Sequence, residues 1–260
     1  MKRVKTSRGP LGLLLPGVVG ALLLLLWHAG VKLSGTSIIP TPLQVLRGLE
    51  ELARQGRLMT YTRDSLVRVL SGYTLAVLLG IPAGLMMGLH APTARVAGPV
   101  VQVLRPISPL AWSPVAILLF GVAHAATLFL IFLSALFPIV AYTREAVQRV
   151  PAIYLRVGHN LGLGRVALLR RVIFPAILPS VLTGLRITLG IAWLVVVAAE
   201  MLGTDSGLGY LIIDARNAGK RYDLVIGGML LIGGIGLGLD LVMRQIERAR
   251  AVRWAFHRED

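Results

Sequence analysis

The sequence contains no cysteine and few acidic residues: 12 Asp and Glu stand against 27 Lys and Arg in 260 residues, a formal net charge of +15. Without thiols, the chain can form neither a disulfide framework nor a thiolate metal site. The histidines are scattered one to a segment, without the spacing of metal ligands; they are His28, His90, His124, His159 and His257. We therefore expect no metal site.

Sequence motifs for several chemistries are also missing. The chain has no Gly-x4-Gly-Lys-Ser/Thr loop for the phosphates of ATP, no His-Glu-x-x-His zinc motif and no nucleophile elbow. No apolar segment carries a pair of carboxylates that could relay protons or act as acid and base. We therefore expect a non-catalytic chain that binds no cofactor of its own.

Charge is sparse overall, and apolar residues dominate. Charged residues make up 15% of the chain against about 25% in soluble proteins, hydrophobic residues make up 55%, and the mean hydropathy is +0.75. The basic excess could indicate nucleic-acid binding, but long apolar runs separate the basic clusters. That pattern favours a membrane protein with positively charged cytoplasmic loops and no nucleic-acid partner.

Six segments could cross a hydrocarbon core, which takes about 20 helical residues, some of them only with tilt or with Pro and Gly interruptions. They are Leu11 to Gly30, Leu66 to Leu89, Val100 to Phe120, Ala125 to Tyr142, Val181 to Leu202 and Leu224 to Met243. The first could instead be a signal peptide, but no clean small-x-small cleavage site follows it. We predict an all-α polytopic bundle of about six transmembrane helices, with residues 1–260 forming one domain.

The basic residues also predict an orientation. An even number of spans places both termini on one side, and both termini are rich in Lys and Arg, so we expect both in the cytoplasm. Residues 143–180 then form a cytoplasmic loop, which carries six arginines and one acidic residue. Residues 31–65 fit the positive-inside rule less well, because they carry a net positive charge although the predicted topology places them outside the cell. An amphipathic helix over Leu43 to Gln55, along the outer surface, explains part of that charge.

Glycine recurs on one face of the second segment, at Gly80, Gly84 and Gly88. Small residues four apart let two helix backbones approach closely inside a membrane. We favour helix packing over a gating role for this face.

The loop over residues 143–180 is longer than a connection between packed helices requires, which indicates a partner. We predict two short helices there: Pro151 to Leu161, and Arg165 to Phe174 ended by prolines. The first carries an apolar stripe with members four residues apart, Ile153, Val157 and Leu161. A short helix with one apolar face can dock into a groove of a soluble protein.

One pattern in this loop, Arg156-Val157-Gly158-x3-Gly162-x9-Val172-x-Phe174-Pro175, resembles the Glu-Ala-Ala-x3-Gly-x9-Ile-x-Leu-Pro signature of permeases of binding-protein-dependent ABC importers. The resemblance implies a coupling helix that fits a cleft in an ATPase subunit. Arg156 and Gly158 depart from the signature, so any contact of its Glu does not transfer. The coupling residues implied are Tyr154, Leu155, Arg156, Val157, Gly158, His159, Asn160, Leu161, Gly162, Phe174 and Pro175.

Three further segments, within residues 65–72, 104–112 and 193–201, resemble the nitrate, sulfonate and taurine class of these permeases, and the last is most similar to its nitrate and bicarbonate branch. The class implies a type I importer permease fold in the inner membrane of a bacterium. It implies four partners for this chain: a second permease copy, two cytoplasmic ATPases that bind ATP and Mg, an external solute-binding protein and the lipid bilayer. The implied cargo is a small oxyanion or sulfonate of the nitrate, bicarbonate, taurine or alkanesulfonate type.

Two other classes of protein remain open from the residues alone: a stand-alone secondary transporter or channel, and an integral membrane enzyme. The lack of paired carboxylates and of a convincing inverted repeat argues against the first, and the lack of a catalytic cluster against the second.

Ionisable residues inside spans need an explanation, because an unpaired charge is costly there. Glu200 could line the pathway or belong to a buried network; since a lone carboxylate would repel an anion, we favour the network. Arg105 and Arg186 could attract an anion. Both lie near predicted cytoplasmic ends of spans, however, where the positive-inside rule explains a basic residue without any ligand, and we favour that explanation. Asp240 lies four residues before Arg244, and an intrahelical pair suffices for it.

Three large side chains, Trp112, Trp193 and Met201, complete the set of candidate pathway or gate residues with Arg105 and Glu200. Packing or anchoring at the membrane interface is the more common role of such side chains.

Overall fold

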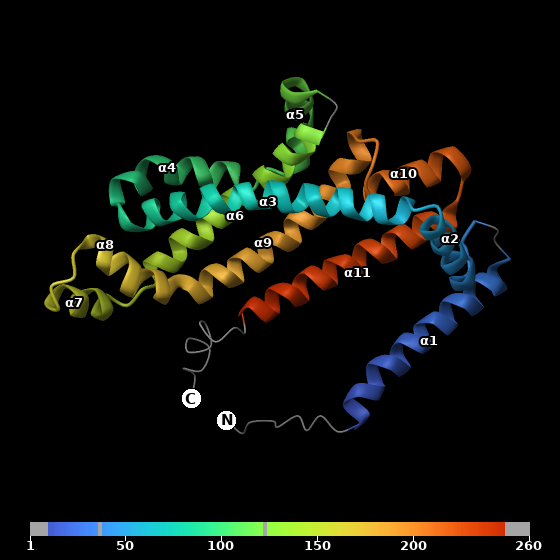
Figure 1. Ribbon diagram of the computed structural model, residues 1–260, viewed down its shortest axis with the longest axis horizontal. Helices are drawn as coiled ribbons and strands as arrows, with labels where there is room; N and C mark the ends of the chain where they lie inside the picture. The colour runs from blue at the N-terminus through green and yellow to red at the C-terminus, as the bar shows by residue number, and fades with distance from the viewer. Residues whose placement is uncertain (1–9, 36–37, 122–123, 248–260) are drawn as a thin grey trace.

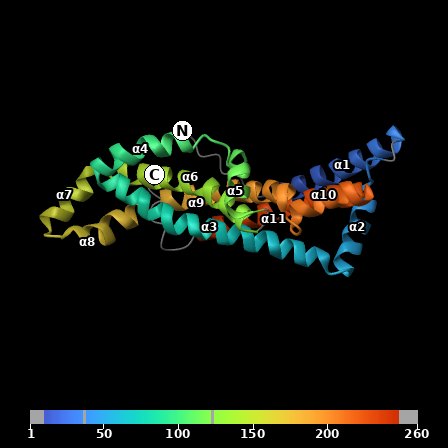
Figure 2. The ribbon, with the colours of Figure 1, turned by 90° about the horizontal axis from the view of Figure 1, so that it is seen from above.

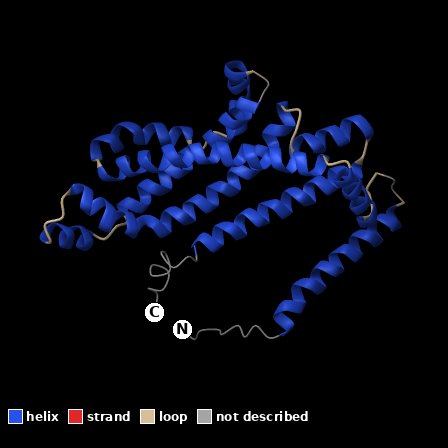
Figure 3. Cartoon of the chain, viewed as in Figure 1, coloured by secondary structure: helices blue, strands red, loops and turns tan. Residues whose placement is uncertain are grey.

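The computed structural model describes residues 10–35, 38–121 and 124–247, with the backbone only for residues 10–14, 16 and 218. All regular elements in these residues are helices (Figure 3), which confirms the all-α class. The helices are α1 (Pro10–Ser34), α2 (Pro42–Arg54), α3 (Arg57–Leu89), α4 (Ala91–Leu104), α5 (Ser113–Phe120), α6 (His124–Gln148), α7 (Ala152–Asn160), α8 (Arg165–Leu168), α9 (Phe174–Gly203), α10 (Leu208–Gly219) and α11 (Tyr222–Glu247). A 3-10 turn, η1 (Pro109–Trp112), precedes α5, and a π-helical turn, η2 (Leu169–Ile173), precedes α9.

Five helical segments in the described residues are long and apolar enough to cross a membrane, and a bent pair raises the number to six. The five contain α1, α3, α6, the continuous stretch from α8 to α9, and α11. The prediction of about six transmembrane helices is therefore confirmed, although the helices extend beyond several predicted ends.

The predicted span Val100 to Phe120 is interrupted by a bend and begins earlier in the chain. α4 already begins at Ala91 and ends at Leu104, and the chain then turns by 92° into η1 and α5. Pro106 and Pro109 lie at this bend. Proline lacks the N–H that a continuing helix needs and disfavours helical geometry in the residue before it.

The second predicted loop helix is wrong as a separate element. α8, η2 and α9 form one helical stretch from Arg165 to Gly203, which Pro175 does not end. Pro175 falls in the first turn of α9, directly after the π-helical turn, where a missing N–H is tolerated. The connection that remains outside regular spans runs only from residue 149 to residue 164.

The bundle is elongated, with α7 and α8 at one end and α2 and α10 at the other (Figure 1). α3, α6 and α9 pack side by side in its centre. α1 stands apart from them and approaches the bundle near α2 (Figures 1 and 2). Residues 22–26 of α1 consequently expose five leucine side chains, which must be covered by lipid or by another chain.

The predicted amphipathic helix is present as α2, where Thr41 and Gln44 form a capping box at its start. Its buried residues are Val45, Gly48 and Leu52, while Leu43 and Leu46 are exposed.

An exposed ion pair ties α2 to the turn before α11. Arg221 Nη2 lies 2.8 Å from Glu51 Oε2, and this guanidinium holds the pKa of the Glu51 carboxyl below its ordinary value. Arg221 also pairs with Asp223, the second residue of α11. α2, the turn before α11 and the start of α11 are thus held together at this end of the bundle.

The glycine face of α3 lies against α6. A Cβ at Gly84 would lie 2.6 Å from Thr143 Cβ and 2.7 Å from the carbonyl oxygen of Val140, and one at Gly80 would lie 2.8 Å from Ile139 Cγ2. The favoured interpretation, close helix packing, thus agrees with the structure. At Gly84 the obstacle includes backbone, which cannot move aside as a side chain can.

Gly84→Ala should therefore separate α3 from α6 and destabilise the bundle by about 1 to 3 kcal/mol. The matched control is Gly190→Ala on α9, where an added Cβ meets nothing within 4 Å. Thermal unfolding of the purified variants in one detergent measures the difference. Equal melting temperatures for the two variants would contradict the packing of this face.

Candidate functional site

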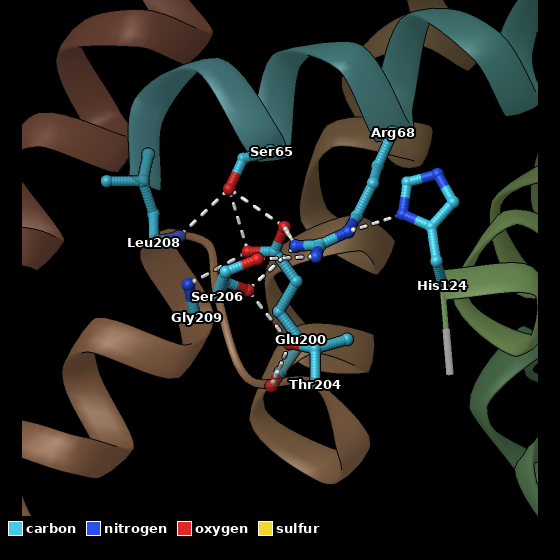
Figure 4. Close-up of polar contacts among 8 residues, drawn as sticks. All are labelled: Ser65, Arg68, His124, Glu200, Thr204, Ser206, Leu208 and Gly209. Carbon is cyan, nitrogen blue, oxygen red and sulfur yellow. Dashed lines mark hydrogen bonds and ion pairs between the residues drawn. The ribbon is translucent and has the colours of Figure 1, made fainter. Parts of the chain in front are cut away.

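A buried ion pair joins α3 to the end of α9 (Figure 4). Arg68 Nη1 donates to Glu200 Oε1 at 2.9 Å, and the two side chains are 5% and 0% exposed. Ser65, one turn before Arg68, has its hydroxyl 2.8 Å from both carboxylate oxygens. The backbone N–H groups of Leu208 and Gly209 complete the cluster by donating to Ser65 Oγ and to Glu200 Oε2.

The remaining donors of Arg68 hold the neighbouring turn and the first residue of α6. Nη1 and Nη2 donate to the carbonyl and hydroxyl oxygens of Ser206, each at 2.7 Å, and Nε donates to His124 Nδ1 at 3.1 Å. Thr204 donates to the carbonyl oxygen of Ser206 from the same turn. The cluster therefore joins α3, α6, α9 and α10 through one guanidinium and one carboxylate.

Gly207, at the centre of this turn, has a φ of +109°, and its Cβ position is already occupied by the Glu200 carboxylate. Only glycine fits there, for both backbone and steric reasons. The turn thus closes over the carboxylate, so Glu200 is not the lone charge that would repel an anion. The structure places it in a buried network, the alternative that the sequence favours.

Arg68 is the functional-site residue that sequence reasoning did not single out. Its signal was present, because an arginine within an apolar segment requires a partner. What the sequence lacked was the identity of that partner, which lies 132 positions further along the chain.

The other candidate gate residues lie in separate places. Trp193 is buried, and its Nε1 donates to the carbonyl oxygen of Ile232 at 3.0 Å, which fixes α11 on α9. Trp112 packs on the small residues of α5, α6 and α9, and Met201 is exposed. Arg105 is exposed, with its guanidinium 5.6 Å from the ring centroid of Tyr142. A common gate formed by these residues stays a prediction.

Arg186 has partners that satisfy its charge without a ligand. Its Nε donates to Asp240 Oδ1 at 2.6 Å and its Nη1 to Glu247 Oε2 at 3.2 Å. Asp240 also pairs with Arg244 at 2.9 Å, as expected from their spacing. These pairs hold α9 against the last turns of α11.

At the far end of the bundle, α7 presents the predicted apolar stripe to the outside. Ile153, Val157 and Leu161 are 56%, 47% and 74% exposed. Gly158 instead faces inward, where a Cβ would collide with Leu168 Cδ1 of α8. The glycine that departs from the permease signature therefore lets α7 lie on α8, and Leu161 and Gly162 turn the chain between them, Gly162 with a φ of +71°.

The other predicted coupling residues surround this stripe. Tyr154 and Leu155 are half-buried, and Leu155 packs on the cluster formed with α8 and α9. The remaining polar ones, Arg156, His159 and Asn160, are exposed. Phe174 and Pro175 form the first turn of α9, with the Phe174 ring exposed. The structure thus brings the two separated parts of the pattern to one end of the molecule (Figure 1).

Comparison with known proteins places this geometry in context. Residues 76–252 match the family model described as binding-protein-dependent transport system inner membrane component. Among curated relatives, a putative ABC transporter permease protein of Methanocaldococcus jannaschii is 39% identical over 87% of each chain. A bicarbonate transport system permease of Synechococcus elongatus is 34% identical over 91% of this chain and 89% of its own. A taurine transport system permease of Escherichia coli is 34% identical, over 92% and 88%.

The fold has a counterpart among solved structures. A chain of the MetNI methionine ABC transporter, in inward facing conformations, superimposes with a TM-score of 0.57 at 17% identity, over 70% of this chain and 93% of that chain. The helical arrangement is therefore that of an ABC importer permease. These matches confirm the resemblance inferred from the sequence.

Arg68→Met and Glu200→Met should each destabilise the protein by about 3 to 5 kcal/mol, because each leaves one buried charge without its partner. The double variant should unfold at a higher temperature than either single variant, since it removes both charges together. Thermal unfolding of the three purified proteins tests this coupling. If the effects of the two substitutions simply add, Arg68 and Glu200 do not form the pair described.

Proposed function

The chain belongs to the family of binding-protein-dependent transport system inner membrane components, and we propose that it forms the solute pathway of an ABC importer. In this proposal the chain performs no catalysis, and the ATP and Mg bind to separate ATPase subunits. ATP-driven closure of those subunits pushes the coupling helix, rotates the attached spans and switches the pathway between outward-facing and inward-facing states. The observation that carries the proposal is the uncovered apolar stripe of α7, at the end of the bundle where the ATPase would lie.

The chemistry of α7 suits a soluble partner. Two apolar side chains of this nine-residue helix, Ile153 and Val157, are exposed, and so is Leu161 directly after its last residue. The charged and polar side chains of Arg156 and His159 lie beside them. An apolar stripe with a polar rim is the usual form of a helix that binds in a groove.

The linkage from α7 to the spans is short. α7 rests on α8 through Gly158, and α8 continues through η2 into α9 without a break. A push on α7 is therefore transmitted to α9, whose other end is anchored to α3 and α10 by Glu200. This mechanical path supports rotation of α9 as the step that opens and closes the pathway.

We propose a second copy of the chain as the other half of the pathway. The exposed leucines of α1 and the separation of α1 from the central helices leave a surface that a second permease can cover. Each copy would dock one ATPase, and an external solute-binding protein would deliver cargo at the end formed by α2 and α10. This arrangement places both termini and α7 in the cytoplasm, as the basic residues favour, and the protein in the cytoplasmic membrane.

The cargo in this proposal is a small oxyanion or sulfonate of the nitrate, bicarbonate, taurine or alkanesulfonate type. Support comes from the relatives named for bicarbonate and for taurine, which cover nearly the whole chain. Both compounds carry an anionic oxygen-rich group, so the shared chemistry is the basis of the proposal.

Affinity purification of the chain from its native membrane in mild detergent tests the assembly. Recovery of an ATPase and a solute-binding protein supports the importer, and ATP-driven uptake of labelled nitrate, bicarbonate or taurine into proteoliposomes then identifies the cargo. Recovery of the chain alone, with uptake that needs no ATP, would contradict the proposal and favour a secondary transporter.

Leu161→Glu should abolish recovery of the ATPase while the chain remains folded, because a charge replaces an exposed apolar contact. The matched control is Leu161→Met, which keeps an apolar side chain and should keep the ATPase. Co-purification, with thermal unfolding as the check on folding, provides the measurement. An ATPase that still co-purifies with the glutamate variant would show that α7 is not the docking helix.

A further inference from the structure

Two adjoining hollows lie between the end of α3, α4 and the end of α6. Their volumes are about 560 Å³ and 260 Å³, and Met87, Gln102, Arg144 and Gln148 line both. We call the combined space the arginine hollow, because Arg95, Arg105 and Arg144 contribute to its walls. Each part far exceeds the roughly 30 Å³ that one water molecule occupies in the liquid.

Arg144, which lines both hollows, has one nitrogen without a hydrogen-bond partner in the described part of the chain. Its Nε is buried and has no hydrogen-bond partner among the described residues. Buried polar atoms without a partner are rare in native structures, and a charged one is costly. Its guanidinium has room there because Gly98 of α4 lies opposite, where an added Cβ would be 3.4 Å from Nη1. The donor is therefore placed by the packing but left without an acceptor.

The charge of the hollow is positive. Glu145 is the one acidic residue among its lining residues, against three arginines, which gives a net charge of +2. Glu145 lies 3.6 Å from Arg149, on the following turn of the same helix, and forms no pair with Arg144 among the described residues. Gln102 and Gln148 add neutral amide donors to the same walls.

The rule that basic residues gather at the cytoplasmic side explains the sign of this charge but not its arrangement. Arginines outside the two hollows satisfy that rule equally well, as Arg170 and Arg171 do. A concave space lined by three arginines and two amide side chains is instead typical of an anion site.

We propose that the arginine hollow binds an oxyanion group, with Arg144 and Arg105 as the charged donors and Gln102 as a neutral one. A planar guanidinium donates two parallel hydrogen bonds to phosphate, sulfonate or carboxylate oxygens, which suits this ligand class. The side of the membrane on which the site lies rests on the proposed function. α4 lies toward the end that carries α7 and α8 (Figure 1), and the proposed function places that end in the cytoplasm. The group comes from one of two sources, a solute leaving the pathway or the headgroup of an anionic lipid.

Binding of sulfate and of anionic lipid to the purified full-length chain tests the site without any partner protein. The chain is reconstituted in phosphatidylcholine nanodiscs, and its melting temperature is followed during titration with sodium sulfate at constant ionic strength, maintained with chloride. A second preparation contains phosphatidylglycerol and no sulfate. The variants are Arg144→Gln and Arg105→Gln, and the control is Arg171→Gln, an exposed arginine that lines neither hollow.

We expect sulfate or phosphatidylglycerol to raise the melting temperature of the wild type and of Arg171→Gln. The rise should be lost in Arg144→Gln and Arg105→Gln. Removal of one charge-assisted hydrogen bond should raise the apparent dissociation constant for sulfate about tenfold or more. Stabilisation by sulfate in neutral lipid identifies a soluble oxyanion, and stabilisation by phosphatidylglycerol alone identifies a headgroup. Arg105 is exposed, so its variant remains informative if Arg144→Gln fails to fold.

Absence of stabilisation by either probe, or stabilisation that persists in Arg105→Gln, would overturn the inference. The outcome is separate from that of the importer proposal, because the measurement requires neither ATPase nor uptake. An ATPase that co-purifies while the hollow binds no anion leaves the importer standing and removes the site. If the chain binds an anion through Arg105 and Arg144 but recruits no ATPase, the anion site stands and the importer proposal is contradicted.

Discussion

The close contact of α3 with α6 is the constraint on which the rest of the structure depends. Gly80 and Gly84 leave no space between the two backbones, so the relative position of the helices has little freedom. Arg68 lies near one end of this contact and Arg144 near the other. A single packed interface therefore positions both the buried ion pair and the arginine hollow.

Among the described residues, buried charged groups have hydrogen-bond partners at one end of the bundle and lack one at the other. At one end, Arg68 and Glu200 satisfy each other with help from Ser65 and backbone N–H groups, so the helices there are tied together. At the other, Arg144 keeps a buried nitrogen without an acceptor. A satisfied network rigidifies a structure, whereas a buried donor without a partner costs free energy. The anchored end suits a pivot, and the open end suits the exchange of partners and cargo in the proposed importer.

Sequence patterns performed well where the physical rule is local. Length and hydropathy located the spans, and the spacing of Ile153, Val157 and Leu161 gave the exposed stripe of α7, because both depend only on neighbouring residues. The same patterns missed the bend within residues 100–120 and failed at residues 165–174. Proline was expected to end a helix at Pro175, yet a π-helical turn that contacts α7 carries the chain through into α9.

By itself, the sequence determined that this chain is a helical membrane protein, since composition and periodicity carry that information directly. Its motifs also resembled those of one permease family, and its long loop predicted a docking site. Tertiary structure alone decided which charges are paired. The partner of Arg68 is distant in the chain, and Gly98 makes room for Arg144 only once α4 folds back on α6. Burial and charge neutralisation depend on neighbours in three dimensions. Only the folded chain therefore shows that Glu200 is paired, in contrast to the arginines of the hollow.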